Sequence, residues 1–377
     1  MYKIFVSAMA FDNGKSGISD YIINTVKMLS LDHKLDIMIL EKDVELFPIK
    51  NNNIKFITIS EKLRKPIVNM LWHLLLLRFK INLKKYDLIF LPAGNRRLIW
   101  GYFNKTIVTF HDLSQFNIEQ KYDKLRMIYI KKFVPFVLKK YKHILSISES
   151  TRKDLKKHYG IDENKIFINY NGYDKEKYNN EPTAYTNNEL IGHDKKYFLY
   201  VARVEHPGKN HMNLIKAYEN LSKEIKDEYL LYMAGGLKER SEEVVNYAKN
   251  SVDSDKIIFG GFVPFEHLPS LYKNASLFIF PSYYEGFGIP LLESMSSGTP
   301  VLCSERPALP EIGGNAVITF DPDDPQNIAD KILLLLNDSL IYSSLVRKGL
   351  ERVDDFSWKK HTDTIINYFE KNIKKGK

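Results

Sequence analysis

Two glutamates, Glu285 and Glu293, are separated by seven residues within the segment Tyr283–Pro300, which also contains Gly286 and Gly288. Glycines let backbone N–H groups approach a ligand, and the start of a helix adds donors and partial positive charge that suit phosphate. Carboxylates accept hydrogen bonds strongly, so one on each side of a phosphate cradle can hold sugar hydroxyls. The pattern predicts a site for a sugar linked to a nucleoside diphosphate. The alternative is two solvated glutamates that flank a turn.

A strand and a helix are expected to position these glutamates. Residues 275–281 form a short apolar run typical of a buried strand, and residues 290–297 have a helical pattern with Pro290 in the first turn. Glu285 is therefore expected in the loop between the two elements, and Glu293 on the helix.

The segment around the two glutamates resembles the E-x7-E signature of the retaining glycosyltransferases of family 4, also called group 1. The similarity extends over nearly the whole chain and is densest over residues 198–325. It implies a GT-B fold, in which two Rossmann-like domains face each other across a cleft. It also implies that Glu285, as a catalytic residue, holds hydroxyls of the sugar and that Glu293 holds those of the ribose. Further substrate contacts are expected in the same motif, at Gly286, Phe287, Gly288, Ile289 and Leu292.

Two cations of the C-terminal half, Arg203 and Lys209, follow an expected strand and precede an expected helix. An arginine and a lysine at such a junction can neutralise a diphosphate leaving group. Each alone would usually be an ordinary surface cation, but together they match the Arg and Lys-Asn pair of the family, which implies a catalytic role. Phe262 and Val263 follow a strand that ends in glycines, and we expect them to contact the nucleotide base.

In the N-terminal half, His111 and Asp112 follow the strand expected at residues 106–110. A histidine at a strand end is more often structural than catalytic, but these residues match the His-Asp-Leu element of the family, which implies that His111 contacts the donor sugar. Asp112 could bind substrate or cap the segment that follows. Gly17 ends a loop, residues 12–17, that resembles the glycine loop over the donor diphosphate and could also be a simple strand–helix turn.

The expected reaction is retaining transfer of a hexose, with mannose or a related sugar favoured, from a nucleotide diphosphate sugar to a hydroxyl. No Asp-x-Asp element follows an expected strand end except residues 321–324, which are typical of a turn and helix cap, so no metal and no other cofactor is expected. The expected acceptor is a glycan or lipid-linked oligosaccharide in bacterial surface polysaccharide biosynthesis.

Other functional classes fit the sequence less well. A nucleotide-sugar-binding scaffold or sensor without turnover would not need the complete set of charged residues at the predicted site. A sugar phosphorylase or nucleotide-sugar epimerase shares the two-domain architecture, but phosphorylases of this shape are usually much longer. A nicotinamide dehydrogenase is disfavoured because no G-x-G-x-x-G follows any expected strand.

With 377 residues, 44% of them hydrophobic, the chain is long enough for two domains. Short apolar strands alternate with amphipathic helical segments in both halves, which predicts an α/β fold with two parallel sheets. We expect an acceptor-binding domain at residues 1–182, a nucleotide-sugar domain at 190–357, a polar linker within 179–194, and a last helix, 358–377, that packs back on the first domain. The strands are expected at residues 3–11, 35–40, 54–59, 87–91, 106–110, 143–147, 197–202, 229–233, 256–259, 276–280, 300–303 and 316–320.

The formal charge of +9 is unevenly distributed. Residues 1–190 contain 32 Lys and Arg against 20 Asp and Glu, a charge of +12, which leaves −3 for residues 191–377. A basic half should meet an acidic partner, and no nucleic-acid motif is present. Basic residues mix with aromatic ones along helical patterns, which favours an anionic membrane surface, with residues 62–85 as the best candidate stretch. An ordinary core-facing helix with solvated ends fits that stretch equally well.

Composition also bears on the compartment. No apolar run approaches the ~20 residues needed to span a bilayer, and the N-terminus is typical of a first strand rather than a signal peptide. The single cysteine, Cys303, excludes an intrachain disulfide and fits a reducing cytoplasm. We therefore expect a cytoplasmic protein, peripherally bound to the inner face of the plasma membrane.

Overall fold

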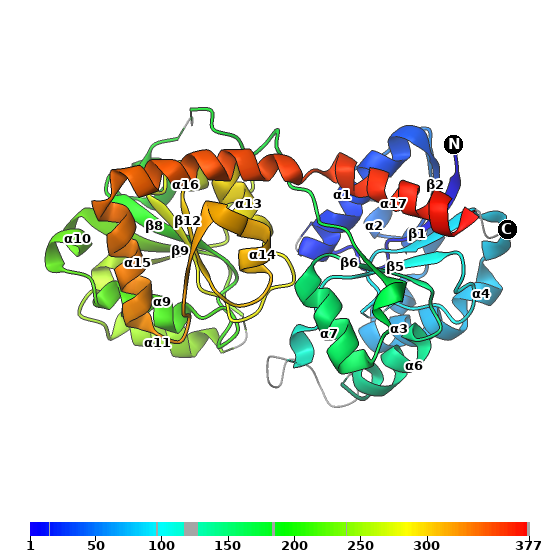
Figure 1. Ribbon diagram of the computed structural model, residues 1–377. Coiled ribbons are helices and arrows are strands. Elements are labelled where there is room, and N and C mark those ends of the chain that lie inside the picture. The colour runs from blue at the N-terminus through cyan, green and yellow to red at the C-terminus, as the bar shows by residue number, and fades with distance from the viewer. Residues whose placement is uncertain (15, 96, 117–126, 183–184, 239, 375–377) are drawn as a thin grey trace. The chain divides into compact units, whose positions relative to one another are not determined.

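The computed structural model describes residues 1–14, 16–95, 97–116, 127–182, 185–238 and 240–374. Its internal contacts divide the chain into two units (Figure 1): unit 1 is Met1–Gly172 with Trp358–Lys377, and unit 2 is Tyr173–Ser357. The predicted linker, residues 179–194, belongs to unit 2. The Ser296 hydroxyl holds the start of this unit, because it donates to the carbonyl oxygen of Tyr178 at 2.6 Å and lies 3.2 Å from the hydroxyl of Tyr173.

Unit 1 contains a parallel sheet, seven-stranded in the described chain, with the order β3-β2-β1-β4-β5-β6-β7. Its inner strands are buried on both faces, as parallel strands between two helical layers must be. The strands are β1 Lys3–Ser7, β2 Lys34–Leu40, β3 Ile54–Ile59, β4 Leu88–Leu91, β5 Thr106–Phe110, β6 His143–Ser146 and β7 Ile166–Ile168. The first strand ends before the predicted Phe11, because the chain turns where the N–H of Phe11 donates to the carbonyl of Ala8. The short strand β7 was not predicted.

The helices of unit 1 cover this sheet. Helix α1 begins where the Ser16 hydroxyl accepts from the N–H of Ser19, and it buries Tyr21, Ile22 and Val26 against the strands. The helices are α1 Gly17–Asp32, α2 Asp43–Leu46, α3 Pro66–Leu75, α4 Leu77–Lys80, α6 Val134–Leu138, α7 Glu149–Tyr159 and α17 Trp358–Asn372, and a π-helical turn, η4, spans Tyr129–Phe133.

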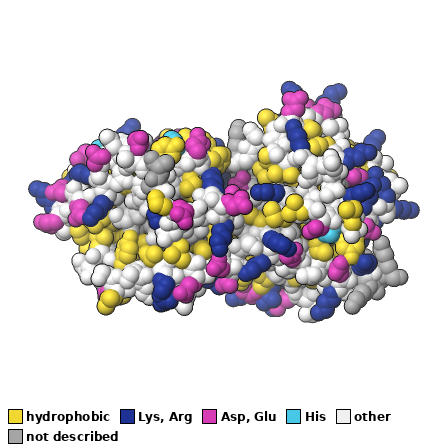
Figure 2. Space-filling view, turned by 90° about the horizontal axis from the view of Figure 1, so that it is seen from above, with side chains coloured by type: hydrophobic (Ala, Val, Ile, Leu, Met, Phe, Trp, Pro, Cys, Tyr) yellow, Lys and Arg dark blue, Asp and Glu magenta, His cyan; other side chains and the backbone are white. Residues whose placement is uncertain are grey.

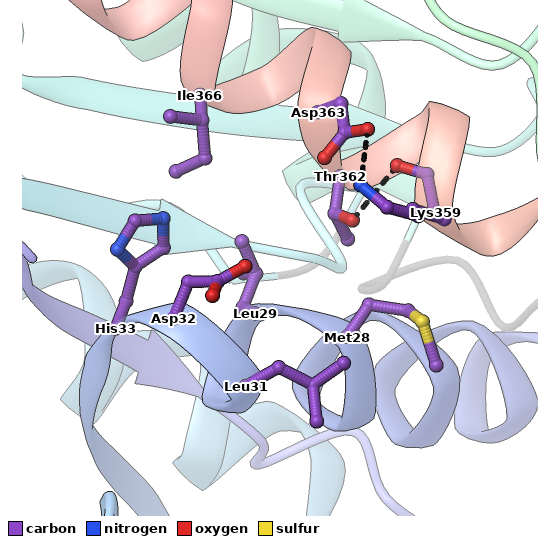
Figure 3. Close-up of a pocket in the computed structure, with 9 residues that line it drawn as sticks. All are labelled: Met28, Leu29, Leu31, Asp32, His33, Lys359, Thr362, Asp363 and Ile366. Carbon is purple, nitrogen blue, oxygen red and sulfur yellow. Dashed lines mark hydrogen bonds and ion pairs between the residues drawn. The ribbon is translucent and has the colours of Figure 1, made fainter.

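The last helix, α17, lies against α1 within unit 1 (Figure 1). Figure 3 shows where their ends meet: Asp32 of α1 and His33 lie on one side of a small pocket, and Lys359 and Asp363 of α17, an ion pair 2.8 Å apart, lie on the other. The two ends of the chain also meet here, because the ring of Tyr2 packs edge-on against Phe369.

Unit 2 contains a second parallel sheet, six-stranded in the part of the chain described, with the order β10-β9-β8-β11-β12-β13. Its strands are β8 Lys196–Val201, β9 Tyr229–Ala234, β10 Ile257–Gly261, β11 Leu277–Phe280, β12 Val301–Ser304 and β13 Val317–Phe320. Its helices are α8 Asn187–Ile191, α9 His211–Glu219, α10 Lys223–Glu228, α11 Ser241–Lys249, α12 Leu268–Asn274, α13 Ile289–Ser296, α14 Leu309–Gly313, α15 Pro325–Asn337 and α16 Ser339–Arg352. The predicted α/β fold with two parallel sheets is confirmed.

Among the described residues, no helix combines the length and the apolar character that crossing a bilayer requires.

Candidate active site

Two of the predicted catalytic residues, Lys209 and Glu285, form an ion pair in unit 2. The Lys209 Nζ lies 2.7 Å from Oε1 of Glu285, and the two side chains are 22% and 14% exposed. Lys209 lies between β8 and α9, and Glu285 between β11 and α13. The chain order reverses between the neighbouring strands β8 and β11, and ligands of open parallel sheets bind at such a point, outside the carboxyl ends of the strands. The pair therefore stands where the topology predicts a ligand site.

The backbones of the two loops are joined as well. The N–H of Tyr283 donates to the carbonyl oxygen of Gly208 at 3.0 Å. The buried Tyr200 hydroxyl donates to the carbonyl oxygen of Lys209 at 2.8 Å, and it lies 3.1 Å from the hydroxyl of Ser282. Burial, together with the charge of Glu285, raises the pKa of Tyr200, so this donor stays protonated. The Lys209–Glu285 pair is thus fixed by the loops that carry it.

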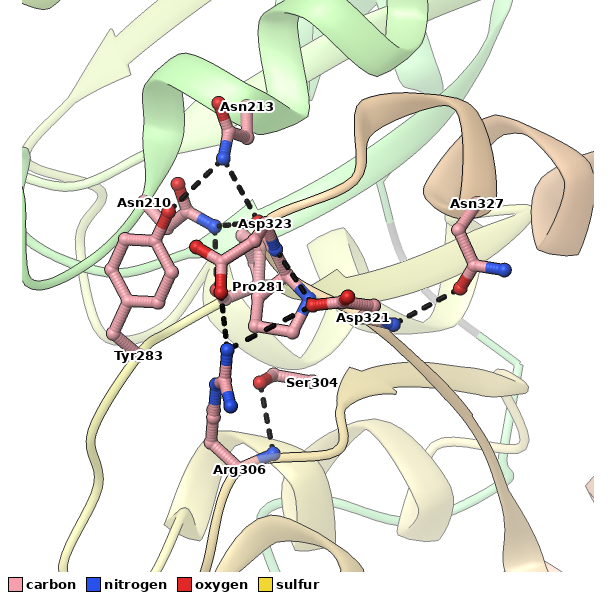
Figure 4. Close-up of polar contacts among 10 residues, drawn as sticks. Asn210, Asn213, Pro281, Tyr283, Ser304, Arg306, Asp321, Asp323 and Asn327 are labelled. Carbon is pink, nitrogen blue, oxygen red and sulfur yellow. Dashed lines mark hydrogen bonds and ion pairs between the residues drawn. The ribbon is translucent and has the colours of Figure 1, made fainter.

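An asparagine completes the junction. Asn210 has a left-handed backbone, with φ of 54°, and its side-chain amide donates to the carbonyl oxygens of Pro281 and Pro322 at 3.1 and 2.8 Å (Figure 4). Asn213 donates from α9 to the same Pro322 carbonyl and to the hydroxyl of Tyr283, at 2.9 and 3.0 Å. These contacts join the loops that follow β8, β11 and β13.

The outer side of this junction carries an arginine that sequence reasoning missed. Arg306, in the loop after β12, pairs with Asp323 and lies 3.8 Å from Asp321 (Figure 4). Burial and a hydrogen bond to Asp323 raise the pKa of Tyr283 to about 12, so the tyrosine links this ion pair to the loop of Glu285. Residues 321–324 are therefore held by Arg306 and Asn210, as expected for a structural turn.

Glu293 has a partner that the sequence did not reveal. It lies on α13, and its Oε2 accepts a hydrogen bond of 2.8 Å from the hydroxyl of Tyr272 on α12. Burial and the charge of Glu293 raise the pKa of Tyr272 well above its usual range, so the hydroxyl stays a donor. A single tyrosine in a helix gives no motif, and only the fold shows what it orients.

Among the predicted substrate contacts around the glutamates, Gly288 has a clear steric role. Its φ is 104°, and a Cβ there would lie 2.7 Å from Cδ2 of Leu309. The side chains of Phe287 and Leu292 are buried in unit 2, so only the backbone atoms of these two residues remain candidates for a ligand contact. Gly286 and Ile289 are half-buried, beside the N-terminus of α13.

The remaining predicted contacts of unit 2 lie nearer the surface. The Arg203 side chain is 56% exposed and lies 3.9 Å from Glu205, so the structure does not place it in the Lys209–Glu285 pair. Phe262 is 71% exposed and packs edge-on against Phe265, and Val263 is half-buried. The contact of Arg203 with the diphosphate stays a prediction, as do those of Phe262 and Val263 with the base.

In unit 1, His111 is buried and held from two sides. Its Nε2 lies 2.6 Å from the carbonyl oxygen of Pro92, which can only accept, so Nε2 carries the hydrogen. Burial lowers the pKa of His111, so the ring is neutral with its lone pair on Nδ1. The hydroxyl of Thr151 donates to the His111 carbonyl oxygen at 3.3 Å. The neutral ring is suited to accept a hydrogen bond from a sugar hydroxyl.

The other two predicted site residues of unit 1 are Asp112 and Gly17. Asp112 contacts a residue two positions further along the chain. Oδ1 of Asp112 accepts from the N–H and the hydroxyl of Ser114, at 3.0 and 2.7 Å, which is a capping arrangement. Gly17 is the first residue of α1, and a Cβ there would meet nothing within 4 Å, so its backbone is accessible. Lys15 of the same loop lies outside the described residues.

The described ranges contain no group of three or more His, Cys, Asp or Glu side chains that could hold a metal ion. Whether the reaction needs a metal is not tested by this observation, so metal independence stays a prediction.

Known proteins resemble the chain in sequence and in fold. Residues 183–352 match the model of the glycosyl transferases group 1, and residues 15–177 match that of glycosyltransferase family 4. O-antigen chain mannosyltransferase B of Escherichia coli is 31% identical over 273 residues, which are 71% of this chain and 70% of the relative.

Two solved structures share the fold. A sucrose-phosphate synthase from Thermosynechococcus elongatus has a TM-score of 0.76 at 17% identity and covers 98% of this chain and 99% of its own. Anabaena HepE, in complex with UDP and glucose, has a TM-score of 0.74 at 15% identity and covers 98% and 100%. With the family matches and the two parallel sheets, these findings establish that the chain belongs to the glycosyl transferases group 1, family 4, and is a glycosyltransferase of the GT-B fold.

Proposed function

We propose that this glycosyltransferase moves mannose or a related hexose from a nucleotide diphosphate sugar, with GDP-mannose as the favoured donor. The product would be a glycan or a lipid-linked oligosaccharide of a bacterial surface polysaccharide. The sugar and the pathway are supported by the similarity to the O-antigen mannosyltransferase of Escherichia coli. The complex of Anabaena HepE with UDP supports a nucleotide-sugar donor in general and makes UDP-hexoses the first alternatives to test.

The observation that carries this proposal is the fixed pair of Lys209 and Glu285. An ammonium has three donors, so Lys209 can hold Glu285 and still meet a phosphate oxygen of the leaving diphosphate. Preorganised charge of this kind is usually the largest contribution to catalysis when negative charge develops on a leaving group. Glu285 would then hold hydroxyls of the sugar, and Glu293, oriented by Tyr272, would hold those of the ribose.

The N-terminal unit would supply the sugar contact and the acceptor site. In this proposal, Nδ1 of the neutral His111 accepts a hydrogen bond from a hydroxyl of the donor sugar, and the accessible backbone at Gly17 faces the diphosphate. We further propose that the reaction retains the configuration of the sugar and needs no metal, because Arg203, Lys209 and the N-terminus of α13 provide the charge that a metal would otherwise supply.

We also propose that unit 1 binds an anionic membrane surface peripherally, on the cytoplasmic side, where a lipid-linked acceptor would lie. Helix α3 buries Met70 and Leu74, yet its opposite side is apolar too. Ile67, Val68, Leu71 and Leu75 are between 42% and 52% exposed, and Phe79 of α4 is 71% exposed. An outward apolar side on a short helix is typical of membrane contact.

Aromatic and basic side chains extend this surface. Trp100 stacks on the exposed Phe136, and its carbonyl oxygen accepts from Arg78, the neighbour of Phe79. The ammonium of Lys140 lies 5.4 Å from the ring centres of both Trp100 and Phe136. In the view of Figure 2, Lys and Arg side chains are interspersed with Asp and Glu on each unit. Charge alone therefore does not single out a binding face.

The proposed donor can be tested without knowing the acceptor. Thermal unfolding is followed with GDP, UDP, GDP-mannose and UDP-glucose in the presence of EDTA, and we expect GDP-mannose to raise the midpoint most. Slow transfer to water, measured as GDP release, should then occur in EDTA and yield mannose with the anomeric configuration of the donor. Binding without any release of nucleoside diphosphate would contradict the proposal and favour a nucleotide-sugar sensor. A larger shift with UDP-glucose would replace mannose by glucose.

A further inference from the structure

A buried tyrosine, Tyr21 of α1, connects His111 to the C-terminal helix. Its ring meets the His111 ring edge-on, with centres 4.6 Å apart at 85°. Its hydroxyl lies 3.1 Å from Oγ1 of Thr109 and 2.9 Å from Nε2 of His361 on α17. Tyr21, Thr109 and His361 are all buried, and Trp358 of α17 packs edge-on against both Tyr21 and His361. Tyr21, near the start of the chain, and His361, near its end, thus contact each other beside the ring of His111, a predicted catalytic residue.

The directions of these hydrogen bonds follow from the partners. Nδ1 of His361 lies 2.9 Å from the carbonyl oxygen of Tyr170, which can only accept, so Nδ1 carries the hydrogen. Burial lowers the pKa of His361 to about 4, so the ring is neutral and its Nε2 is an acceptor. The Tyr21 hydroxyl therefore donates to His361, and the Thr109 hydroxyl donates to Tyr21.

The backbone of His361 is fastened too. Its carbonyl oxygen accepts from the side-chain amide of Asn169 at 2.9 Å, next to the Tyr170 carbonyl that its ring contacts. His361 is thus anchored to the segment after β7 by two hydrogen bonds, and it presents Nε2 to Tyr21 from a fixed position. A buried hydroxyl that donates one hydrogen bond and accepts another has little freedom to move.

His111 therefore has three supports: the Pro92 carbonyl on Nε2, the Thr151 hydroxyl on its own carbonyl, and the Tyr21 ring against the imidazole. The first two leave the ring able to rock about its Nε2–H bond. The ring of Tyr21 limits that motion, and the hydroxyl of Tyr21 is in turn held by Thr109 and His361.

We propose that Tyr21 and His361 are positioning residues for His111. Through these two residues, the C-terminal helix α17 directs the Nδ1 lone pair of His111 toward the donor sugar. This inference rests on the proposed function of His111. Neither residue belongs to a motif that the sequence singled out, and 340 positions separate them along the chain.

The first test compares two tyrosine hydroxyls that each contact a histidine ring. Tyr21 on α1 contacts His361, and Tyr368 on α17 contacts His143. Tyr21→Phe removes the hydroxyl and keeps the ring. The control, Tyr368→Phe, removes a hydroxyl of α17 that lies 3.1 Å from Nδ1 of His143, away from His111. For GDP-mannose hydrolysis, we expect Tyr21→Phe to lower kcat about tenfold with an unchanged KM, as for a loosened sugar contact. Tyr368→Phe should leave both constants unchanged. Equal loss of kcat in the two variants would overturn the inference.

A second test asks whether Tyr21 and His361 act as one unit. Gln at position 361 can still offer an oxygen to the Tyr21 hydroxyl, whereas Leu cannot, so His361→Gln should retain most of the kcat that His361→Leu loses. The double variant with Tyr21→Phe and His361→Leu should be no slower than the slower single variant, because both remove the same contact. Additive losses, or equal losses for Gln and Leu, would contradict a positioning role.

A third measurement does not depend on turnover. In protein labelled with ¹⁵N-histidine, the ring resonances of His111, assigned with His111→Asn, should shift in Tyr21→Phe and stay in place in Tyr368→Phe. Unshifted resonances would overturn the inference even in an active enzyme. If the unmodified protein releases no nucleoside diphosphate from GDP-mannose or UDP-hexoses, the proposed function fails, and this spectrum still decides whether Tyr21 sets the ring.

Discussion

The Nζ of Lys209 and Oε1 of Glu285 are 2.7 Å apart, although 76 positions separate these residues along the chain. The likeness to the family gave the lysine to the diphosphate and the glutamate to the sugar, as separate tasks. In the proposed mechanism their contact couples the two tasks, because movement of Lys209 toward a phosphate would also move the partner of the Glu285 carboxylate. A change at either residue should therefore affect both donor binding and donor discrimination.

We expect Lys209→Met to lower kcat/KM by about two orders of magnitude or more, which corresponds to roughly 3 kcal/mol of lost charge stabilisation. It should also reduce the preference between GDP-mannose and UDP-glucose, because Glu285 loses its partner. Lys196→Met is the matched control, since Lys196 forms an exposed pair with Glu228 in the same unit. Steady-state kinetics with both donors checks this, and activity within threefold of the parent would rule out a phosphate contact by Lys209.

Tyr272→Phe should weaken binding of the free nucleotide about tenfold, because Glu293 loses a hydrogen bond that orients it, worth about 1.5 kcal/mol when the acceptor is charged. The turnover at saturating donor should change little. Tyr342→Phe serves as control, because the hydroxyl of Tyr342 donates to the Ser276 carbonyl within the same unit and does not contact Glu293. Isothermal titration with GDP and UDP measures the effect. Equal affinities for the parent and Tyr272→Phe would show that Glu293 needs no such support.

Gly288→Ala should destabilise unit 2 by about 2 kcal/mol or more, because an L-residue is strained at its φ of 104° and the new Cβ would lie 2.7 Å from Leu309. Gly236→Ala should be tolerated, since nothing lies within 4 Å of a Cβ built there and its φ is not positive. Urea unfolding, followed with a probe in unit 2, compares the two variants. Similar midpoints would contradict the steric argument.

The membrane proposal predicts salt-sensitive binding to vesicles that contain phosphatidylglycerol. Each exposed apolar side chain of the surface on α3 and α4 should contribute about 1 kcal/mol when it enters the lipid interface. The triple variant Leu71→Ser, Leu75→Ser and Phe79→Ser should therefore lose binding and keep its affinity for GDP. Leu340→Ser, at a side chain of unit 2 that is 81% exposed, is the control.

Flotation of vesicles measures this binding at low and high salt. The variants change apolar side chains and no lysine. Lys85, for example, has its Nζ 3.4 Å from the buried carboxylate of Asp36, so its loss would lower the stability of unit 1. If the unmodified protein stays unbound even at low salt, the basic and apolar side chains of unit 1 have another role, and a water-soluble acceptor becomes the better expectation.

Much of the fold could be predicted from the sequence, because buried parallel strands are continuous apolar runs. The buried strand at Thr106–Phe110 has the predicted bounds. The strand at Ile166–Ile168 was missed, since three residues are too short for a periodic signal. The internal contacts begin unit 2 at Tyr173, whereas the predicted first domain extends to residue 182. Tyr173 and Tyr178 pack on Ser296 through contacts that composition does not reveal.

The candidate site was predictable in part. The motif residues stand out by type and spacing, and the fold brings Lys209 and Glu285 together at the point where the strand order reverses. Tyr272 and Tyr21 could not be found in this way. Each acts through a hydroxyl that contacts a residue far away in sequence or on another helix, and single tyrosines are common in buried helices.

Unit 1 is built from the beginning and the very end of the chain, with all of unit 2 between them. During synthesis, α17 leaves the ribosome after unit 2, so unit 2 can fold while unit 1 still lacks this helix. The hydrogen bond from Tyr21 to His361 forms only once that helix has docked, as does the contact of Tyr2 with Phe369. A nascent chain that still lacks α17 would thus have a complete unit 2 and incomplete packing around His111. If His111 has its proposed role, sugar transfer begins only after α17 has docked.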